Sequence, residues 1–142
     1  MIRPLVAGLI MVCAGHASAD GGSLVGVAKV RGPDTLVVRG ARVKFSGVLP
    51  PAGSAVCADG VACVDAASTA LAELLSSGPV TCAKEHRLGH GYFLGRCRNA
   101  DGTDPAAALL ARGLLQPDAA APRGYAEAAA AAKAAGAGIW GR

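Results

Sequence analysis

Aromatic residues are scarce in this chain of 142 residues, which has two Phe, two Tyr and one Trp. Proteins that bind single-stranded nucleic acid stack bases on aromatic side chains, so the scarcity argues against a base-stacking surface. Charge is modest as well, because 14 Lys and Arg stand against 10 Asp and Glu. This balance is compatible with phosphate ligands but excludes a nucleic-acid polycation.

The sequence also lacks an apolar run long enough to span a bilayer. Its N-terminal run, Leu5 to Ala14, follows Arg3 and precedes Ala17-Ser18-Ala19. A basic start, a short apolar stretch and an A-x-A ending are typical of a secretory signal peptide, so we expect cleavage after Ala19. Residues 20–142 are then one periplasmic or secreted domain with no membrane association. A buried N-terminal helix and a lipid anchor on Cys13 are the alternatives.

Cysteines are few, and one of the five leaves with the signal peptide. Four remain in residues 20–142: Cys57, Cys63, Cys82 and Cys97. An even number in an exported chain predicts two disulfides, with three possible pairings. We favour Cys57–Cys63 around a small turn and Cys82–Cys97 between neighbouring strands. Zinc is the alternative, but C-x-x-C spacing is absent and only His86 and His90 remain as imidazole ligands.

The first half of the domain predicts strands joined by short turns. We expect strands over Leu24–Val30, Thr35–Val38 and Val43–Val48, with a turn at Arg39-Gly40. The segment that follows, from Pro50 to about Cys63, should be a loop, because two prolines exclude a helix. Three consecutive strands of this kind favour the beginning of a small barrel.

The middle of the chain predicts one helix and two strands. Asp65 is expected to cap a helix that reaches Leu75 or Ser77. Pro79–Ala83 and Gly91–Arg98 are expected to be paired strands. The connection between them carries Glu85, His86 and His90, and we expect it to be flexible and solvated.

The last third predicts two helices. Asp104-Pro105 is a helix start, with a side-chain cap followed by proline, and this helix should end at Gly113. Pro117–Pro122 is expected to be a linker. Arg123–Ala135 should form an alanine-rich helix that Gly136 ends, and Trp140 should then act as a packing anchor.

Six segments resemble, in order, motifs of one known family. They are Gly32-Pro33-Asp34-Thr35, Lys44–Ala52, His90–Gly95, Asp104–Leu114, Tyr125-Ala126-Glu127 and Gly138-Ile139-Trp140. These are similar to the D-G-D-T, R-L-x-G-I-D-A-P-E, Y-G-R-x-L-A, D-A-x-x-L-V-x-x-G-L, Y-x-x-A-E and G-I-W patterns of the thermonuclease (staphylococcal-nuclease-like) family. The likeness covers nearly all of residues 20–142. It implies a β-barrel with helices, an α+β fold, as a five-stranded OB-fold with about three α-helices.

The resemblance implies a site for phosphodiester cleavage, but most of its positions are altered here. Members of the family hold calcium with two aspartates, use a glutamate as the base and bind the phosphate with two arginines. Asp34 matches the first aspartate, and Lys44 replaces the first arginine without its planar fork. The acidic residue that the family carries two positions before the first aspartate is Gly32 here. The second calcium aspartate, the threonine near the metal and the glutamate fall on Leu49, Pro50 and Ala52. The second arginine falls on Tyr92. Arg96, on the same expected strand as Tyr92, is a candidate for a displaced second arginine.

These losses predict a nuclease homologue without activity or cofactor, acting as a binding module for an unidentified protein or polymer. Calcium prefers about six to eight oxygen ligands, so Asp34 alone is a poor metal site. A cap on backbone amides would explain Asp34, and a solvated strand position would explain Lys44. The first alternative is an active calcium-dependent phosphodiesterase that uses Asp34, Lys44 and Arg96, with Glu85 or His90 as base. The second alternative is a single-stranded nucleic-acid binder.

Overall fold

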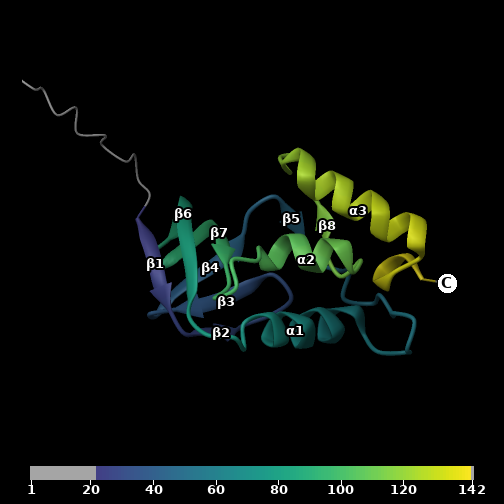
Figure 1. Cartoon of the computed structure of the whole chain (residues 1–142), viewed down its shortest axis with the longest axis horizontal. Helices are drawn as coiled ribbons and strands as arrows, with labels where there is room; N and C mark the ends of the chain where they lie inside the picture. The colour runs from purple at the N-terminus through teal and green to yellow at the C-terminus, as the bar shows by residue number, and fades with distance from the viewer. Residues whose placement is uncertain (1–21, 142) are drawn as a thin grey trace, which may run out of the picture.

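The computed structural model describes residues 22–141, which form a curved sheet with three α-helices gathered beside one end of it (Figure 1). The strands are β1 (Ser23–Gly26), β2 (Ala28–Val30), β3 (Thr35–Val38), β4 (Ala41–Phe45), β5 (Val48–Leu49), β6 (Val80–Gly89), β7 (Tyr92–Arg98) and β8 (Gln116–Pro117). The helices are α1 (Cys63–Leu74), α2 (Pro105–Ala111), α3 (Arg123–Ala135) and the short 3-10 helix η1 (Gly138–Trp140).

The main sheet is mixed and nearly closes into a barrel. Its strand order is β1-β6-β7-β4-β3-β2, and β4 and β7 are its parallel pair. The expectation of five strands with one over Leu24–Val30 is wrong, because this stretch breaks at Val27 into β1 and β2. Val27 is 77% exposed, and the chain bends there so that β1 pairs with β6 while β2 pairs with β3. One bent segment thus serves both edges of the six-stranded sheet.

The hairpin of β3 and β4 confirms the turn expected at Arg39-Gly40. Arg39 has φ 50° and Gly40 has φ 80°, so both central residues are left-handed, as in the type I′ turns that match strand twist. The inward side chains of this hairpin, Val43 and Phe45 among them, are fully buried. They meet Leu71 of α1 and leucines of α2 in a core shared by the sheet and the helices.

The connection expected to be flexible between Cys82 and Cys97 is instead a long hairpin. β6 continues to Gly89, and only His90-Gly91 forms the turn into β7. Charged residues along β6 hide the strand in the sequence because no alternating apolar pattern marks it. The register shifts between Lys84 and His86, which leaves Glu85 at a bulge.

Both disulfides have the pairings favoured from the sequence, Cys57–Cys63 and Cys82–Cys97. Cys82 and Cys97 lie directly opposite each other in β6 and β7. Cys63 is the first residue of α1, so Asp65 does not cap this helix as expected. The disulfide and a hydrogen bond from the Cys63 N–H to the Ala55 carbonyl fix the start instead.

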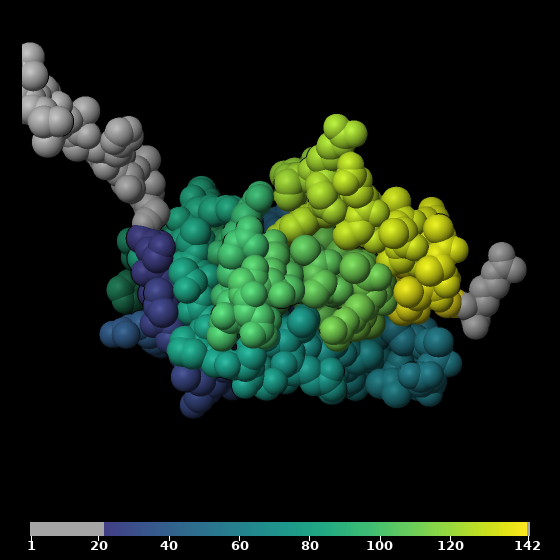
Figure 2. All heavy atoms as spheres, in the orientation of Figure 1, coloured from purple at the N-terminus to yellow at the C-terminus, as the bar shows by residue number. Residues whose placement is uncertain are grey.

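Helix α2 lies between α1 and α3, as the space-filling view also shows (Figure 2). The Asp104 side chain caps α2 by accepting from the N–H groups of Ala106 and Ala107, as predicted. Gly136 ends α3 with φ 64°. The expected linker Pro117–Pro122 is partly strand, because β8 pairs with β5.

Trp140 is a packing residue at the end of the chain. The N–H of Ile139 donates to the Gly113 carbonyl. A Cβ on Gly113 would clash with the backbone carbonyl of Ala137 and would also lie 3.1 Å from Cδ1 of Trp140. This close approach, together with a φ of 69°, explains why glycine stands at the end of the α2 segment.

Candidate functional site

Asp34 and Lys44, which the resemblance to thermonucleases made candidate site residues, form an ion pair. Asp34 precedes β3 and Lys44 lies on β4, and the two strands pair with Thr35 opposite Lys44. Lys44 Nζ lies 3.1 Å from Asp34 Oδ2, and Thr35 Oγ1 donates to Asp34 Oδ1. The expected backbone cap is not what Asp34 forms, because its carboxylate accepts from the Thr35 hydroxyl and pairs ionically with the Lys44 ammonium, whose side chain is 33% exposed.

The lysine balances the charge of Asp34 without fully satisfying it. Asp34 Oδ2 is buried, and among residues 22–141 it has no aligned hydrogen-bond donor. The ammonium is close enough for ion pairing, but its geometry does not meet that of a hydrogen bond. A buried carboxylate is costly without a counter-charge, so Lys44 acts as the resident cation of this position.

The donor set around Asp34 does not fit calcium. The neighbouring family positions carry Leu49, which is half exposed, Pro50 and Ala52, and none of these offers a carboxylate. Within the described part of the chain, no three His, Cys, Asp or Glu residues gather as metal ligands. Calcium prefers about six to eight oxygen ligands, usually with several carboxylates.

A second polar cluster joins β4, β6 and β7. Ser46 Oγ donates to Glu85 Oε2 over 2.7 Å, and Arg96 Nε lies 2.8 Å from Glu85 Oε1. The bulge in β6 turns Glu85 toward both partners. Each carboxylate oxygen of Glu85 therefore already has a partner, which makes this residue a poor candidate for a free general base.

Tyr125 and Asp104 extend this cluster toward the helices. The Arg96 guanidinium lies 5.8 Å from the centre of the Tyr125 ring, and the Tyr125 hydroxyl donates to Asp104 Oδ2. Burial, and then the bond to the Asp104 carboxylate, raise the pKa of Tyr125 far above its ordinary value. Tyr125 is thus a neutral donor over the whole physiological range.

The remaining predicted site residues do not converge on Asp34. Tyr92, at the family position of the second arginine, lies opposite Arg42 across β4 and β7. The Arg42 guanidinium stands 4.8 Å from the Tyr92 ring centre. His90 is in the hairpin turn with its Nδ1 3.4 Å from Arg87 Nη2, and His86 lies on β6 opposite Leu94.

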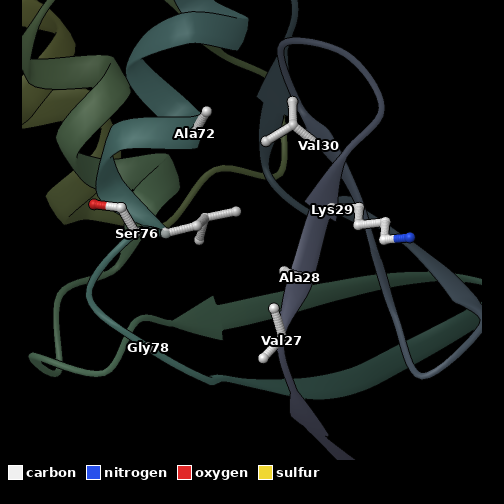
Figure 3. A pocket seen from close by; sticks show the side chains of 8 residues that line it. Val27, Ala28, Lys29, Val30, Ala72, Ser76 and Gly78 are labelled. Atoms are coloured by element: carbon white, nitrogen blue, oxygen red, sulfur yellow. The ribbon is translucent and has the colours of Figure 1, made fainter.

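A surface hollow lies elsewhere, between β2 and the C-terminal end of α1 (Figure 3). It has a volume of about 600 Å³ and is lined mainly by apolar side chains, among them Val27, Val30 and Leu75. Figure 3 shows the Lys29 side chain pointing away from α1. The other polar side chain of its lining, Ser76, donates its hydroxyl to the Glu73 carbonyl.

The sequence singled out Asp34, Lys44 and Arg96 as candidate site residues. It did not indicate that Ser46, Tyr125 and Asp104 lie in one polar cluster with Glu85 and Arg96. Their contacts join residues separated by 21 to 39 positions, and no local motif records such pairs. A weaker signal was available in β7, where Arg96 and Arg98 alternate with the inward Gly95 and Cys97.

These features define a barrel-like α+β domain that two disulfides hold together. No family model matches the chain. The chain is 33% identical over 145 residues to "Succinoglycan biosynthesis protein ExoI" of Rhizobium meliloti (strain 1021), an alignment that spans 98% of this chain and 74% of that protein. The chain belongs to the family of that protein.

Two disulfides are typical of proteins that fold in an oxidising compartment, and they fit an extracellular or periplasmic protein. In residues 22–141 no helix is sufficiently long and apolar for a transmembrane span. The predicted signal peptide, residues 1–19, lies outside the described residues.

Proposed function

We propose that this chain is an exported, thermonuclease-like OB-fold domain that has lost nuclease chemistry and works as a binding module. The strand order supports the fold assignment. If β1 and β2 are counted as one bent strand, the sheet has five strands, with a parallel pair between β4 and β7. A partly open five-stranded barrel is the architecture of OB-folds.

The ion pair between Lys44 and Asp34 is the main evidence for the loss of catalysis. Asp34, the one acidic residue that matches the metal site of thermonucleases, is already neutralised by the Lys44 ammonium at 3.1 Å. Phosphodiester cleavage needs a group that stabilises the developing charge and a base that activates water. The candidate base Glu85 is bound by Ser46 and Arg96.

The name of the relative suggests the setting in which such a module works. That protein is described by its role in succinoglycan biosynthesis. By analogy, we propose that this chain binds a polymer or a protein partner outside the cytoplasm during the assembly of a polysaccharide.

A digestion assay tests the loss of activity. The mature domain, residues 20–142, is incubated with single-stranded DNA and calcium, and the products are separated by size. We expect intact DNA, because any two of the missing groups remove most of the rate: a base contributes roughly 10²–10⁴-fold. Calcium-dependent cleavage that Asp34→Asn abolishes would overturn the proposal and favour the phosphodiesterase that uses Arg96 with Glu85 or His90.

The binding of single-stranded nucleic acid is a weaker candidate. Phe45 and Tyr125 are buried, while Tyr92 and Phe93 lie under the cations of Arg42 and Lys84. Few ring faces are therefore open for bases. Oligonucleotide binding that weakens steeply with added salt would favour this function over binding to an apolar protein face.

A further inference from the structure

The outer face of β7 carries two arginines that the Asp34 position does not involve. Arg96 and Arg98 are two residues apart and both exposed, so they project from the same face of the strand. Cys97 between them points inward into the disulfide with Cys82. This bond ties β7 to β6 beneath the two arginines.

The strands beside β7 place small and hydroxyl-bearing residues next to these arginines. Ala83 of β6 lies opposite Arg96, and Thr81 lies opposite Arg98. Ser23 of β1 pairs with Ala83 in turn. A shallow groove of about 290 Å³ follows from this arrangement, lined by Ser23, Thr81, Ala83, Arg96, Arg98 and Asp104. The small side chain of Ala83 leaves room between the two arginines.

Both guanidinium groups are held in place but keep donors to offer. Arg96 Nε lies 2.8 Å from Glu85 Oε1, and Arg98 Nη1 donates to the Gly102 carbonyl over 3.0 Å. These are their polar contacts within residues 22–141, and a guanidinium has five N–H donors. Most of the donors thus remain available, on side chains whose position is already restrained.

The carboxylate in the groove does not compete strongly for these donors. Asp104 Oδ1 accepts from the N–H groups of Ala106 and Ala107, and Oδ2 accepts from the Tyr125 hydroxyl. Its two oxygens are therefore already engaged by three donors. A ligand at Arg96 and Arg98 meets the guanidinium N–H donors that the Glu85 carboxylate and the Gly102 carbonyl do not use.

We propose that this groove binds an oxyanion carried on a sugar, with the carboxylate or phosphate held by Arg96 and Arg98 and the sugar hydroxyls held by Thr81 and Ser23. Planar guanidinium groups match the two oxygens of such anions. Side-chain hydroxyls both donate and accept hydrogen bonds, as sugar hydroxyls require. The inference deepens the proposed binding role and rests on it, but it uses a different part of the barrel from Asp34.

Titrations of the mature domain with four probes test the groove: glucuronate, a hexose phosphate, inorganic phosphate and uncharged glucose, each followed by amide chemical shifts. We expect the two charged sugars to bind more tightly than glucose, with shifts centred on Thr81, Ala83 and Arg96. The tighter of the two charged sugars identifies carboxylate or phosphate as the natural anion.

Variants separate the groove from general charge effects. The double variant Arg96→Gln/Arg98→Gln should bind both charged sugars roughly tenfold more weakly or worse, the loss expected for at least one charge-assisted hydrogen bond. Arg112→Gln, at an exposed site at the end of α2, removes one positive charge away from the groove and should leave sugar binding unchanged. Thr81→Val keeps both arginines and should weaken the charged sugars but not inorganic phosphate.

Two results would overturn the proposal that this groove binds a charged sugar. One is no binding of either charged sugar by the wild-type domain, and the other is equal binding by the wild type and the double variant. The digestion assay described above is independent of this titration. If the domain binds no sugar and also leaves DNA intact, only the proposal of a sugar-binding groove is wrong. If the domain cleaves DNA, the proposed loss of nuclease activity is wrong.

Discussion

The ion pairs Asp34–Lys44 and Glu85–Arg96 bridge neighbouring strands of the same barrel, yet they differ in burial and in spare hydrogen-bonding capacity. The side chains of Lys44 and Asp34 are 33% and 8% exposed, whereas those of Arg96 and Glu85 are 44% and 37% exposed. In the first pair a compact ammonium compensates a buried carboxylate. In the second, a planar guanidinium uses one contact and keeps its other donors.

The comparison indicates that cross-strand pairs of a carboxylate and a cation have two different roles in this small barrel. The buried pair engages the Asp34 carboxylate, so Asp34 cannot offer its oxygens to a metal without displacing Lys44. The exposed pair instead restrains Arg96 beside Arg98 while leaving both open to a ligand. The following variants test whether stability and binding separate between the two regions in this way.

The largest effect is expected from the Cys82–Cys97 disulfide, which ties β6 to β7 and so holds Glu85 near Arg96. Replacing both cysteines by alanine should lower the free energy of unfolding by about 3 kcal/mol, the chain-entropy value for a loop of this length. Urea unfolding measures the change. Hydrogen exchange should then rise mainly in β6 and β7, and an equal rise around Asp34 would mean that the two regions are not distinct.

Removing the cation of the buried pair should have the next largest effect. Lys44→Met leaves the Asp34 carboxylate buried with no counter-charge and should cost about 2 kcal/mol, in the range for a lost charged partner. Lys44→Arg is the matched control and should retain most of the stability. If urea unfolding shows Lys44→Met to be as stable as the wild type, Lys44 does not compensate Asp34.

Tyr125→Phe should cost about 1 kcal/mol at neutral pH, because it removes the hydroxyl bond to Asp104. Burial raises the pKa of Tyr125, so the folded state keeps the phenol protonated where the unfolded state ionises. This contribution to stability is complete below the ordinary pKa of about 10 and is lost as the pH rises above it. The wild type should therefore lose more stability than Tyr125→Phe between neutral and strongly alkaline pH, and parallel pH profiles of urea unfolding would contradict the assignment.

The exposed pair should contribute least to stability. Glu85→Gln should change the free energy of unfolding by about 0.5 kcal/mol, since exposed ion pairs are worth little. The same variant should loosen Arg96, so chemical shifts in the groove should change although the fold does not. A loss as large as that of Lys44→Met would show that Glu85 and Arg96 serve the core rather than the surface.

Local signals in the sequence were sufficient for much of the fold. The Arg39-Gly40 turn, the Asp104 cap, the Gly136 stop and both disulfides follow from residue types and spacing. Element ends set by tertiary contacts were not predictable. β6 is long because β7 pairs with it through a charged stretch, and α1 starts early because Cys63 is tied to Cys57.

The candidate site also has a part that the sequence could predict and a part that it could not. Asp34 and Lys44 could be singled out from motif positions, but their ion pair depends on the register of β3 against β4, which places Lys44 beside Thr35. The cluster around Glu85 depends on a bulge that no residue type announces. Register and bulges arise from the whole sheet, so side-chain partners across strands are learned only from the structure.

Calorimetric titration of calcium into the mature domain, residues 20–142, is the decisive experiment for the Asp34 position. We expect no saturable heat, because Lys44 already neutralises Asp34 and because Leu49 and Ala52 supply no carboxylate. The variant Asp34→Asn should give the same flat titration. Saturable calcium binding by the wild type that Asp34→Asn abolishes would instead show that Asp34 serves a metal site.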